Sequence, residues 1–389
     1  MRDGLAGAEE GFWGEVEERG TPLVEPIPGD PGHLAVTFLW RGTGATRRVL
    51  ALVNRLMDPL DLGGSLMRRV PGTRVWSITY RMAPDHAGSY RLASGEAEDL
   101  REVAARAGHD PLNGRTIPVR WGEGRASVFE LPGAPVPPWR PWNGPQAGVP
   151  EGAVTRERIR SAALGDERDV WVYLPPGPRN GPLDTLVLLD GDMWFGKFGV
   201  RALFDRLVAD GTVPPLAVIA PHAVSNAVRM AEYGGNPAHA EYLADELLPW
   251  ARGRLPLTAD PARTVIAGES LGGLTALHLG LAAPGAFGKV LAQSASLWWH
   301  PDGDRDADPW ITARYAAAPR RGLRLHVRVG RHEWAVVDGH RDLDRTLRAK
   351  GYPVAYSEYN GGHDYVCWAD GLAAGLADLL GGAREGRPG

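Results

Sequence analysis

A serine in a turn flanked by glycines is the residue whose setting in this sequence most clearly indicates chemistry. The segment Gly268-Glu269-Ser270-Leu271-Gly272 follows the apolar run 264–267 and precedes a second apolar run at 274–279. This order predicts a strand, a Gly-x-Ser-x-Gly turn and a helix, which is the setting of a nucleophile elbow. In such a turn a strained backbone pushes the Ser270 hydroxyl outward, and the glycines avoid Cβ atoms that would collide with neighbouring chain. The alternative is a serine that only caps the helix.

His363 is the best candidate for the base that a serine nucleophile needs. It stands in Gly361-Gly362-His363-Asp364, after the last predicted strand, 354–359, and before a predicted terminal helix at 369–380. A loop at that place can deliver an imidazole to the ends of the strands, and its two glycines allow a close approach of the backbone. The alternative, among eleven histidines, is an ordinary histidine of a surface loop.

A carboxylate that orients the base would follow the penultimate strand, 323–329. There the sequence reads Arg331-His332-Glu333-Trp334, and Glu333 is our choice. Asp338 is the second candidate, whereas Asp364 is too close in sequence to orient the imidazole of its neighbour. Two alternatives stay open: Glu333 could be an acid that only complements a helix N-terminus, or a Ser–His dyad could work without an acid.

Two backbone amides are candidates to bind the oxyanion that forms when an ester carbonyl is attacked. The amide of Leu271 lies at the N-terminus of the helix after the serine, where the helix dipole favours negative charge. The second donor is the amide of Asp192, or of Gly191, in the turn after the apolar strand 185–189. One such donor is worth roughly 3 kcal/mol of barrier. We expect Asp190 to organise this loop rather than to react.

Composition excludes several other functions. The chain has 389 residues, 43% of them hydrophobic, and a net charge of −4, which does not favour nucleic-acid binding, although a local basic patch could hold an anionic ligand. The single cysteine, Cys367, excludes an intramolecular disulfide and argues against a cysteine-based metal site. We expect no cofactor. No apolar run reaches membrane-spanning length and no signal peptide is evident, so we expect a cytoplasmic protein.

Two styles of sequence meet near residue 150, and they predict two domains, 1–150 and 151–389. Short strands with frequent turns, at 34–40, 48–53, 74–80 and 127–131, indicate an antiparallel sandwich in the first domain. The segment 132–150, rich in proline and tryptophan, is interpreted as a linker.

In the second domain, apolar strands alternate with helices. The predicted strands are 170–174, 185–189, 216–220, 264–267, 289–292, 323–329 and 354–359, and the predicted helices include 198–209 and 236–252. This alternation is typical of an α/β fold with a mainly parallel sheet covered on both faces. With the serine ahead of the histidine in the chain, the fold class is that of an α/β-hydrolase.

From about residue 34 onward, the sequence resembles the enterochelin esterases, bacterial enzymes that hydrolyse catecholate trilactone siderophores. The resembling segments of the first half are 36–41, 76, 80–81, 110–113, 130–135 and 139. Those of the second half are 168–173, 189–191, 194, 246–250, 268–273, 293–296, 298–299, 361–364 and 368. The resemblance implies an immunoglobulin-like amino-terminal domain that partly covers an α/β-hydrolase site. It also implies a small-molecule catecholate substrate, taken as its ferric complex, so that the iron belongs to the ligand.

The resemblance also suggests residues that bind the substrate. Arg229 stands three residues before Glu232, with Tyr233 in place of the usual leucine, and its planar fork could pair with catecholate oxygens. The alternative is a salt bridge to Glu232.

Tryptophans near the ends of two strands could stack on dihydroxybenzoyl rings. Trp298 and Trp299 follow the strand 289–292, and we expect one of them to be exposed and the other to belong to the core. Trp334 is a weaker third candidate.

The mechanism predicted from these residues is nucleophilic ester hydrolysis, with Ser270 as nucleophile and His363 as general base and acid. A broad carboxylesterase or an acyltransferase would have the same elbow and is the main alternative. A non-catalytic binding protein is a third hypothesis, against which the intact Ser270, His363 and acid candidate argue.

Overall fold

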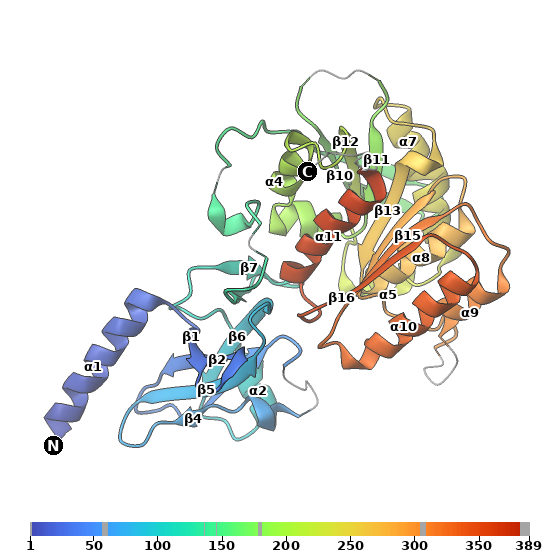
Figure 1. The fold of residues 1–389 in the computed structure, drawn as a ribbon. Helices are drawn as coiled ribbons and strands as arrows, with labels where there is room; N and C mark the ends of the chain where they lie inside the picture. Colours follow the sequence, from blue (N-terminus) through green and yellow to red (C-terminus); the bar gives the residue numbers. More distant parts are fainter. Residues whose placement is uncertain are drawn as a thin grey trace. The chain divides into compact units, whose positions relative to one another are not determined.

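The computed structural model describes residues 2–56, 61–135, 137–144, 146–177, 181–303 and 309–381. Residues 136 and 145 of the predicted linker lie outside the described residues. The chain forms two compact units (Figure 1). The first unit is Met1–Val136 together with Asn360–Cys367, and the second is Pro137–Tyr359 together with Trp368–Gly389. The segment 360–367, which carries His363, therefore packs with the first unit although both its neighbours in the chain belong to the second.

The first unit is a sandwich of two antiparallel sheets, ordered β1-β2-β5-β4 and β3-β6-β8-β7. Its strands are β1 (Leu23–Ile27), β2 (Asp30–Arg41), β3 (Arg48–Val53), β4 (Arg68–Arg69), β5 (Val75–Met82), β6 (Ala87–Gly95), β7 (Thr116–Pro118) and β8 (Arg125–Glu130). Side chains from both sheets share one core, in which Phe38 of β2 and Tyr90 of β6 meet edge to face at 4.6 Å. The predicted antiparallel sandwich is confirmed.

Two helices cover parts of this sandwich. Helix α1 (Arg2–Arg19) buries Trp13 and Val16 against Leu39 and Val75. Helix α2 (Leu100–Ala104) packs through Val103 on Leu50 of β3 and Ala93 of β6, on the other face of the β3-β6-β8-β7 sheet.

The second unit is built on one eight-stranded sheet, ordered β16-β15-β14-β13-β11-β12-β10-β9. The strands are β9 (Ala153–Ser161), β10 (Asp166–Leu174), β11 (Asp184–Leu188), β12 (Leu216–Pro221), β13 (Thr264–Glu269), β14 (Lys289–Gln293), β15 (Arg324–Gly330) and β16 (Val354–Tyr359). The six strands from β11 to β16 run parallel, and β10 and β9 are antiparallel additions at one edge. The predicted mainly parallel α/β sheet is confirmed, and the carboxyl ends of β11 and β13 to β16 share one edge.

Helices lie on both faces of this sheet (Figure 1). They are α4 (Arg201–Ala209), α5 (Asn226–Glu232), α6 (Pro237–Glu241), α7 (Leu248–Arg252), α8 (Leu271–Ala282), α9 (Trp310–Ala317), α10 (Trp334–Ala349) and α11 (Tyr365–Leu380), with the short α3 (Gly191–Met193) after β11. None of the helices in the described ranges is long and apolar enough to cross a membrane.

Two predicted helices are interrupted for identifiable reasons. The helix predicted at 198–209 begins only at Arg201, because Gly199 adopts a left-handed conformation with φ 76°. The helix predicted at 236–252 is split by a wide π turn, Tyr242–Leu247, just before Pro249. Proline has no N–H to donate and its ring crowds the preceding turn, so the widened turn accommodates it.

Candidate active site

The structure shows the predicted nucleophile elbow at the centre of the parallel sheet. Strand β13 ends at Glu269, Ser270 has φ 59° and ψ −123°, and α8 begins at Leu271. Backbone bonds fix the strained residue, since the Ser270 N–H donates to the Gln293 carbonyl at 3.0 Å and its own carbonyl accepts from the Ser296 N–H at 3.0 Å. The Ser270 hydroxyl is half-buried and lies 3.3 Å from the Ser296 hydroxyl. The helix-cap alternative loses support, because Ser270 makes no side-chain capping bond.

The glycines around Ser270 are not equivalent. A Cβ atom on Gly268 would lie 2.5 Å from the backbone carbonyl carbon of Gly272, well inside any real contact distance. On Gly272 it would have its nearest neighbour at 3.5 Å, an ordinary contact, whereas on Gly273 it would meet the Gln293 carbonyl at 3.0 Å. The expected need for glycine therefore holds at Gly268, and the second crowded position is Gly273 rather than Gly272.

The predicted oxyanion loop lies beside the elbow. Strands β11 and β13 are neighbours, with Leu188 opposite Ala267, so the turns that follow them meet at one edge of the sheet. Gly191 and Asp192 open α3, and the first amides of a helix have no partner within it. A Cβ atom on Gly191 would collide with the backbone of Ala220, so only glycine fits there. The Asp192 carboxylate accepts from the Ala223 N–H at 3.1 Å, which fixes the loop to the end of β12.

A buried ion pair holds the turn after β11 and the turn after β13. Asp190, fully buried and left-handed at φ 62°, accepts two bonds from Arg229, at 2.8 Å to Nε and 2.7 Å to Nη2. The same Nη2 donates to the carbonyl of Glu269, the residue before the nucleophile, at 3.2 Å. Burial of both charges is compensated by this two-bond geometry. The expectation that Asp190 organises its loop is confirmed.

For Arg229 the outcome differs from both interpretations of the sequence. Arg229 is 8% exposed and one edge of its fork is taken by Asp190, so that edge is not available to a catecholate. The alternative bridge to Glu232 is wrong, because Glu232 pairs with Arg168, at 2.8 Å between Oε2 and Nη1. Burial explains the difference, since a buried charge must find a partner wherever the fold brings one. A contact of Arg229 with substrate stays a prediction.

Glu333 is buried at the carboxyl end of β15. It is 2% exposed, and its Oε1 accepts from the Ser294 hydroxyl at 2.6 Å and from the Gly330 N–H at 3.0 Å. Ser294 in turn accepts from Trp368 Nε1 at 3.0 Å and lies 3.1 Å from the Tyr359 hydroxyl. Sequence reasoning did not assign a role to Ser294, although it follows β14 in a segment that carries the resemblance.

The second acid candidate has a different environment. Asp338 lies on α10 with a side chain that is 85% exposed and pairs with Arg341 at 3.0 Å. A carboxylate held among buried donors keeps a fixed orientation, whereas an exposed one on a helix surface does not. Glu333 is therefore the more firmly held of the two carboxylates, and its role as the acid stays a prediction.

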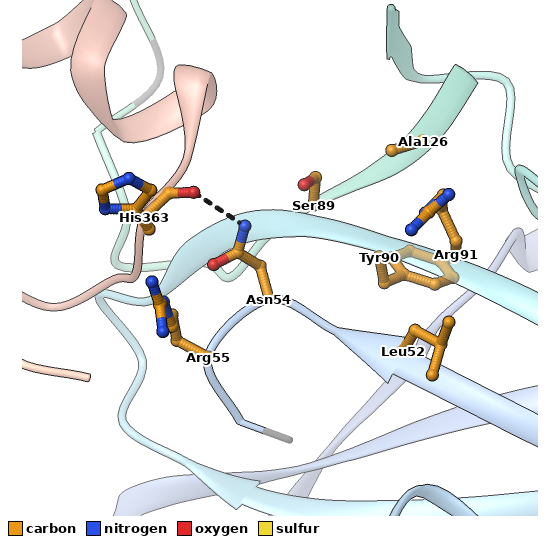
Figure 2. Close-up of a pocket in the computed structure, with 8 residues that line it drawn as sticks. All are labelled: Leu52, Asn54, Arg55, Ser89, Tyr90, Arg91, Ala126 and His363. Atoms are coloured by element: carbon orange, nitrogen blue, oxygen red, sulfur yellow. Dashed lines mark hydrogen bonds between the residues drawn. The ribbon is translucent and has the colours of Figure 1, made fainter. Parts of the chain in front are cut away.

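His363 lies in the loop that leaves the carboxyl end of β16 and leads into α11. Asn54 of the first unit donates through Nδ2 to the His363 carbonyl at 2.9 Å (Figure 2). The neighbouring Asp364 accepts from the Ser89 N–H at 2.6 Å and from the Val366 N–H at 3.0 Å, so its carboxylate anchors the loop and caps α11. The pairing of His363 with Ser270 stays a prediction.

The tryptophan pair divides as expected. Trp298 is 42% exposed, whereas Trp299 packs on the core of the second unit and donates to the Gly234 carbonyl at 3.2 Å. Their rings meet edge to face at 5.8 Å. Trp334 is 55% exposed at the start of α10. The geometry leaves Trp298 and Trp334 accessible for stacking, but their contact with substrate stays a prediction. In the described parts of the chain, no three metal-ligating side chains of the types His, Cys, Asp and Glu gather to hold an ion.

Two family models match the chain. Residues 35–140 match the model "Enterochelin esterase, N-terminal", and residues 161–379 match the model "Putative esterase". The iron(III) salmochelin esterase of Escherichia coli O6:H1 is 33% identical over 95% of this chain and 93% of its own length. The iron(III) enterobactin esterase of Dickeya dadantii is 33% identical over 96% and 93%.

Solved structures agree with these relatives. The enterobactin esterase of Shigella flexneri, determined in the presence of enterobactin, is 28% identical and covers 94% of this chain and 97% of its own, with a TM-score of 0.82. The ferric enterobactin esterase of Salmonella typhimurium is 29% identical over 94% and 98%, with a TM-score of 0.83. With the strand–turn–helix elbow and both family models in place, the chain belongs to the enterochelin esterases and is a carboxylic ester hydrolase.

Proposed function

We propose that this protein hydrolyses the ester bonds of a catecholate trilactone siderophore, of the enterobactin type, and that it takes the ferric complex as substrate. The observation that carries the proposal is Ser270, held at φ 59° at the end of β13, with the turn of Gly191 and Asp192 at the end of the neighbouring strand β11. Such strain persists only where the surrounding structure enforces it, which supports a reactive role for the Ser270 hydroxyl. Support for the substrate comes from the relatives named above, which match nearly the whole chain.

The first step forms an acyl-enzyme. His363 takes the proton of the Ser270 hydroxyl as its oxygen attacks a lactone carbonyl. The amide of Leu271 and that of Asp192 or Gly191 stabilise the oxyanion. When the intermediate collapses, the ester C–O bond breaks and His363 gives its proton to the departing alkoxide. Water then attacks the acyl-Ser270 ester with His363 as base, which frees the carboxylic acid and restores the serine.

Glu333 completes this scheme as the residue that orients His363. Its position at the end of β15, one strand from the origin of the histidine loop, and the donors from Ser294 and Gly330 support this role. A buried carboxylate of this kind holds the imidazole in one tautomer and stabilises the imidazolium that forms during the reaction.

Ring opening explains how such an enzyme would aid iron release inside the cell. A cyclic scaffold keeps three catechols around one iron ion at high effective concentration. Hydrolysis of the scaffold separates the arms, so that effective concentration and iron affinity both fall. The iron is part of the substrate, and the proposal needs no metal held by the protein.

The test is hydrolysis of a ferric trilactone by wild-type and Ser270→Ala protein, with products identified by mass spectrometry. We expect the variant to lose about 10⁴-fold or more in kcat, as for removal of a nucleophile from comparable triads. Ser357→Ala, which changes an exposed serine of β16, should retain wild-type activity. Near-normal hydrolysis by Ser270→Ala would contradict the proposal. A wild-type preference for simple aryl esters over trilactones would favour a broad carboxylesterase.

A further inference from the structure

A cavity of about 380 Å³ lies on the outer face of the sheet β3-β6-β8-β7 in the first unit. Leu52 and Arg91 face each other across β3 and β6, and Ala126 of β8 lies beyond them. Tyr90, whose hydroxyl donates to Asp110 at 2.8 Å, belongs to the inner core, so Arg91 next to it projects from the opposite face. The volume lies in the range of small-molecule sites.

On this face of the sheet, helix α2 and the His363 loop cover the residues on either side of Leu52, Arg91 and Ala126. Two residues back along β3, Leu50 is covered by α2, and two residues forward, Asn54 holds the His363 loop. The cavity is therefore the uncovered stretch between α2 and that loop, and His363 forms part of its wall (Figure 2). A ligand seated here lies next to the predicted catalytic base.

Arg55 is fixed beside His363 by its backbone. It has φ 59°, a conformation that non-glycine residues adopt only where the surroundings require it. The preceding Asn54 makes two hydrogen bonds. Its N–H donates to the Ser89 carbonyl at 3.0 Å, and its side-chain amide donates to the His363 carbonyl. A Cβ atom on Gly362 would lie 2.7 Å from Cβ and Cγ of Arg55, so that glycine lets the loop lie flat against the arginine. Arg55 and His363 both line the cavity (Figure 2).

The cavity combines positive charge with an apolar floor. Arg55 and Arg91 are both half-buried, and within the described residues neither forms an ion pair. Leu52 and Ala126 provide apolar surface between strands. A planar ring with anionic oxygens at one edge matches this combination, because a guanidinium fork binds an oxygen pair and an aliphatic floor takes the ring.

We propose that this cavity binds one catecholate arm of the ferric siderophore, and that Arg55 and Arg91 select the iron-loaded anion over the iron-free ligand. The inference rests on the proposed function. Binding to iron removes the protons of the catechol hydroxyls, so the ferric complex carries a net negative charge that the free ligand lacks. Arg229 has one edge of its fork occupied by Asp190, whereas Arg55 and Arg91 line an open cavity.

The test measures binding of ferric and iron-free trilactone to full-length Ser270→Ala protein, by quenching of its tryptophan fluorescence. Arg55→Gln and Arg91→Gln should each raise Kd for the ferric complex about tenfold or more, the loss expected for a charge-assisted contact. Their effect on the iron-free ligand should be several-fold smaller, and Arg91→Lys should recover part of the loss. The matched control is Arg68→Gln, at an exposed arginine of β4 outside the cavity.

A second kind of variant tests the cavity without removing either arginine. Leu52→Glu places a negative charge on the cavity floor and keeps both arginines, and it should weaken ferric binding selectively; its melting temperature is measured as well, because Leu52 also packs against the cluster of Leu50 and Val103. If wild-type protein hydrolyses the ferric trilactone but Kd is unchanged in Arg55→Gln, Arg91→Gln and Leu52→Glu, the inference is wrong and the proposed function stands. If wild-type protein neither binds nor hydrolyses the trilactone, both are wrong. Equal losses for ferric and iron-free ligand would also overturn the selection for charge.

Discussion

The two glycines of the Gly-x-Ser-x-Gly turn should respond very differently to the same substitution. In Gly268→Ala the new methyl group would lie 2.5 Å from the Gly272 carbonyl carbon and 2.6 Å from its oxygen. Carbon atoms attract one another best at about 3.5–4.0 Å, so the two segments must separate by about 1 Å. Neither can move freely, because Gly272 belongs to the first turn of α8 and Ser270 is tied to Gln293.

The consequence of that separation is a displaced Ser270 hydroxyl. A misplacement of about 1 Å lowers the rate of a well-oriented reaction about 10²-fold, and overpacking of a rigid interior costs about 1–3 kcal/mol of stability. We therefore expect Gly268→Ala to lose about 10²-fold in kcat for the trilactone. Its melting temperature should fall by roughly 2–4 °C for each kcal/mol lost. Initial rates from product chromatography and a thermal unfolding scan measure the two effects.

Gly272→Ala is the matched control. Its Cβ atom would have neighbours no closer than 3.5 Å, and alanine is preferred to glycine inside a helix by about 0.5–1 kcal/mol. We expect kcat within a few-fold of wild type and an unchanged or slightly higher melting temperature. If both alanine variants lost activity equally, crowding at Gly268 would not be the reason for the motif, and our account of the elbow would be refuted.

Three further predictions concern the groups around the elbow. Glu333→Gln should lower kcat about 10²–10⁴-fold, whereas Asp338→Asn should stay within about twofold; equal losses would contradict the assignment of the acid. Arg229→Met leaves Asp190 buried without its partner and should cost about 3–5 kcal/mol in chemical denaturation, with a smaller loss when Asp190→Asn is added. Burial lowers the pKa of His239 to about 3 from an ordinary value near 6.5. As pH falls, the unfolded chain protonates His239 before the folded chain does. The contribution of neutral His239 to the free energy of unfolding is therefore fully present above pH 6.5 and is lost as pH falls toward 3, by at most about 1.4 kcal/mol per pH unit. His239→Phe should reduce the drop in unfolding free energy between pH 7 and 5, and an unchanged drop would exclude His239 as its source.

Local pattern predicted the fold where a segment's own residues determine its structure. The apolar runs that became β3 and β16 have the bounds that the sequence indicated. Strand β6 (Ala87–Gly95) was not predicted, because glycine, serine and alanine interrupt its apolar pattern. Its hydrogen bonds to β3 and β8 stabilise it as a strand. Strand β9 (Ala153–Ser161) is mostly exposed and charged, and its register with β10 supports it.

In the candidate site, too, local features could be predicted from the sequence and contacts between distant segments could not. The backbone conformations of Ser270 and Asp190 follow from short motifs, since glycine spacing, strand ends and helix starts are all local features. The partners of Glu333 could not be predicted, because Ser294 and Gly330 are brought to it by the parallel order of β14 and β15. The cavity beside Arg55 could not be predicted from the sequence either, because its lining residues come from three strands and from a loop far along the chain.

The placement of Arg229 shows how burial reassigns charges that sequence spacing pairs locally. An arginine and a glutamate three residues apart on a helix suggest a surface bridge, but the fold turns Arg229 inward to Asp190 and gives Glu232 to Arg168. Removal of a partner from a buried pair costs far more than rearrangement of a surface one, so Arg229 is held where it bonds Asp190 and the carbonyl of Glu269. A half-buried arginine differs from this buried pair, because a ligand can still displace water from it. Arg55 and Arg91 of the first unit are two such residues.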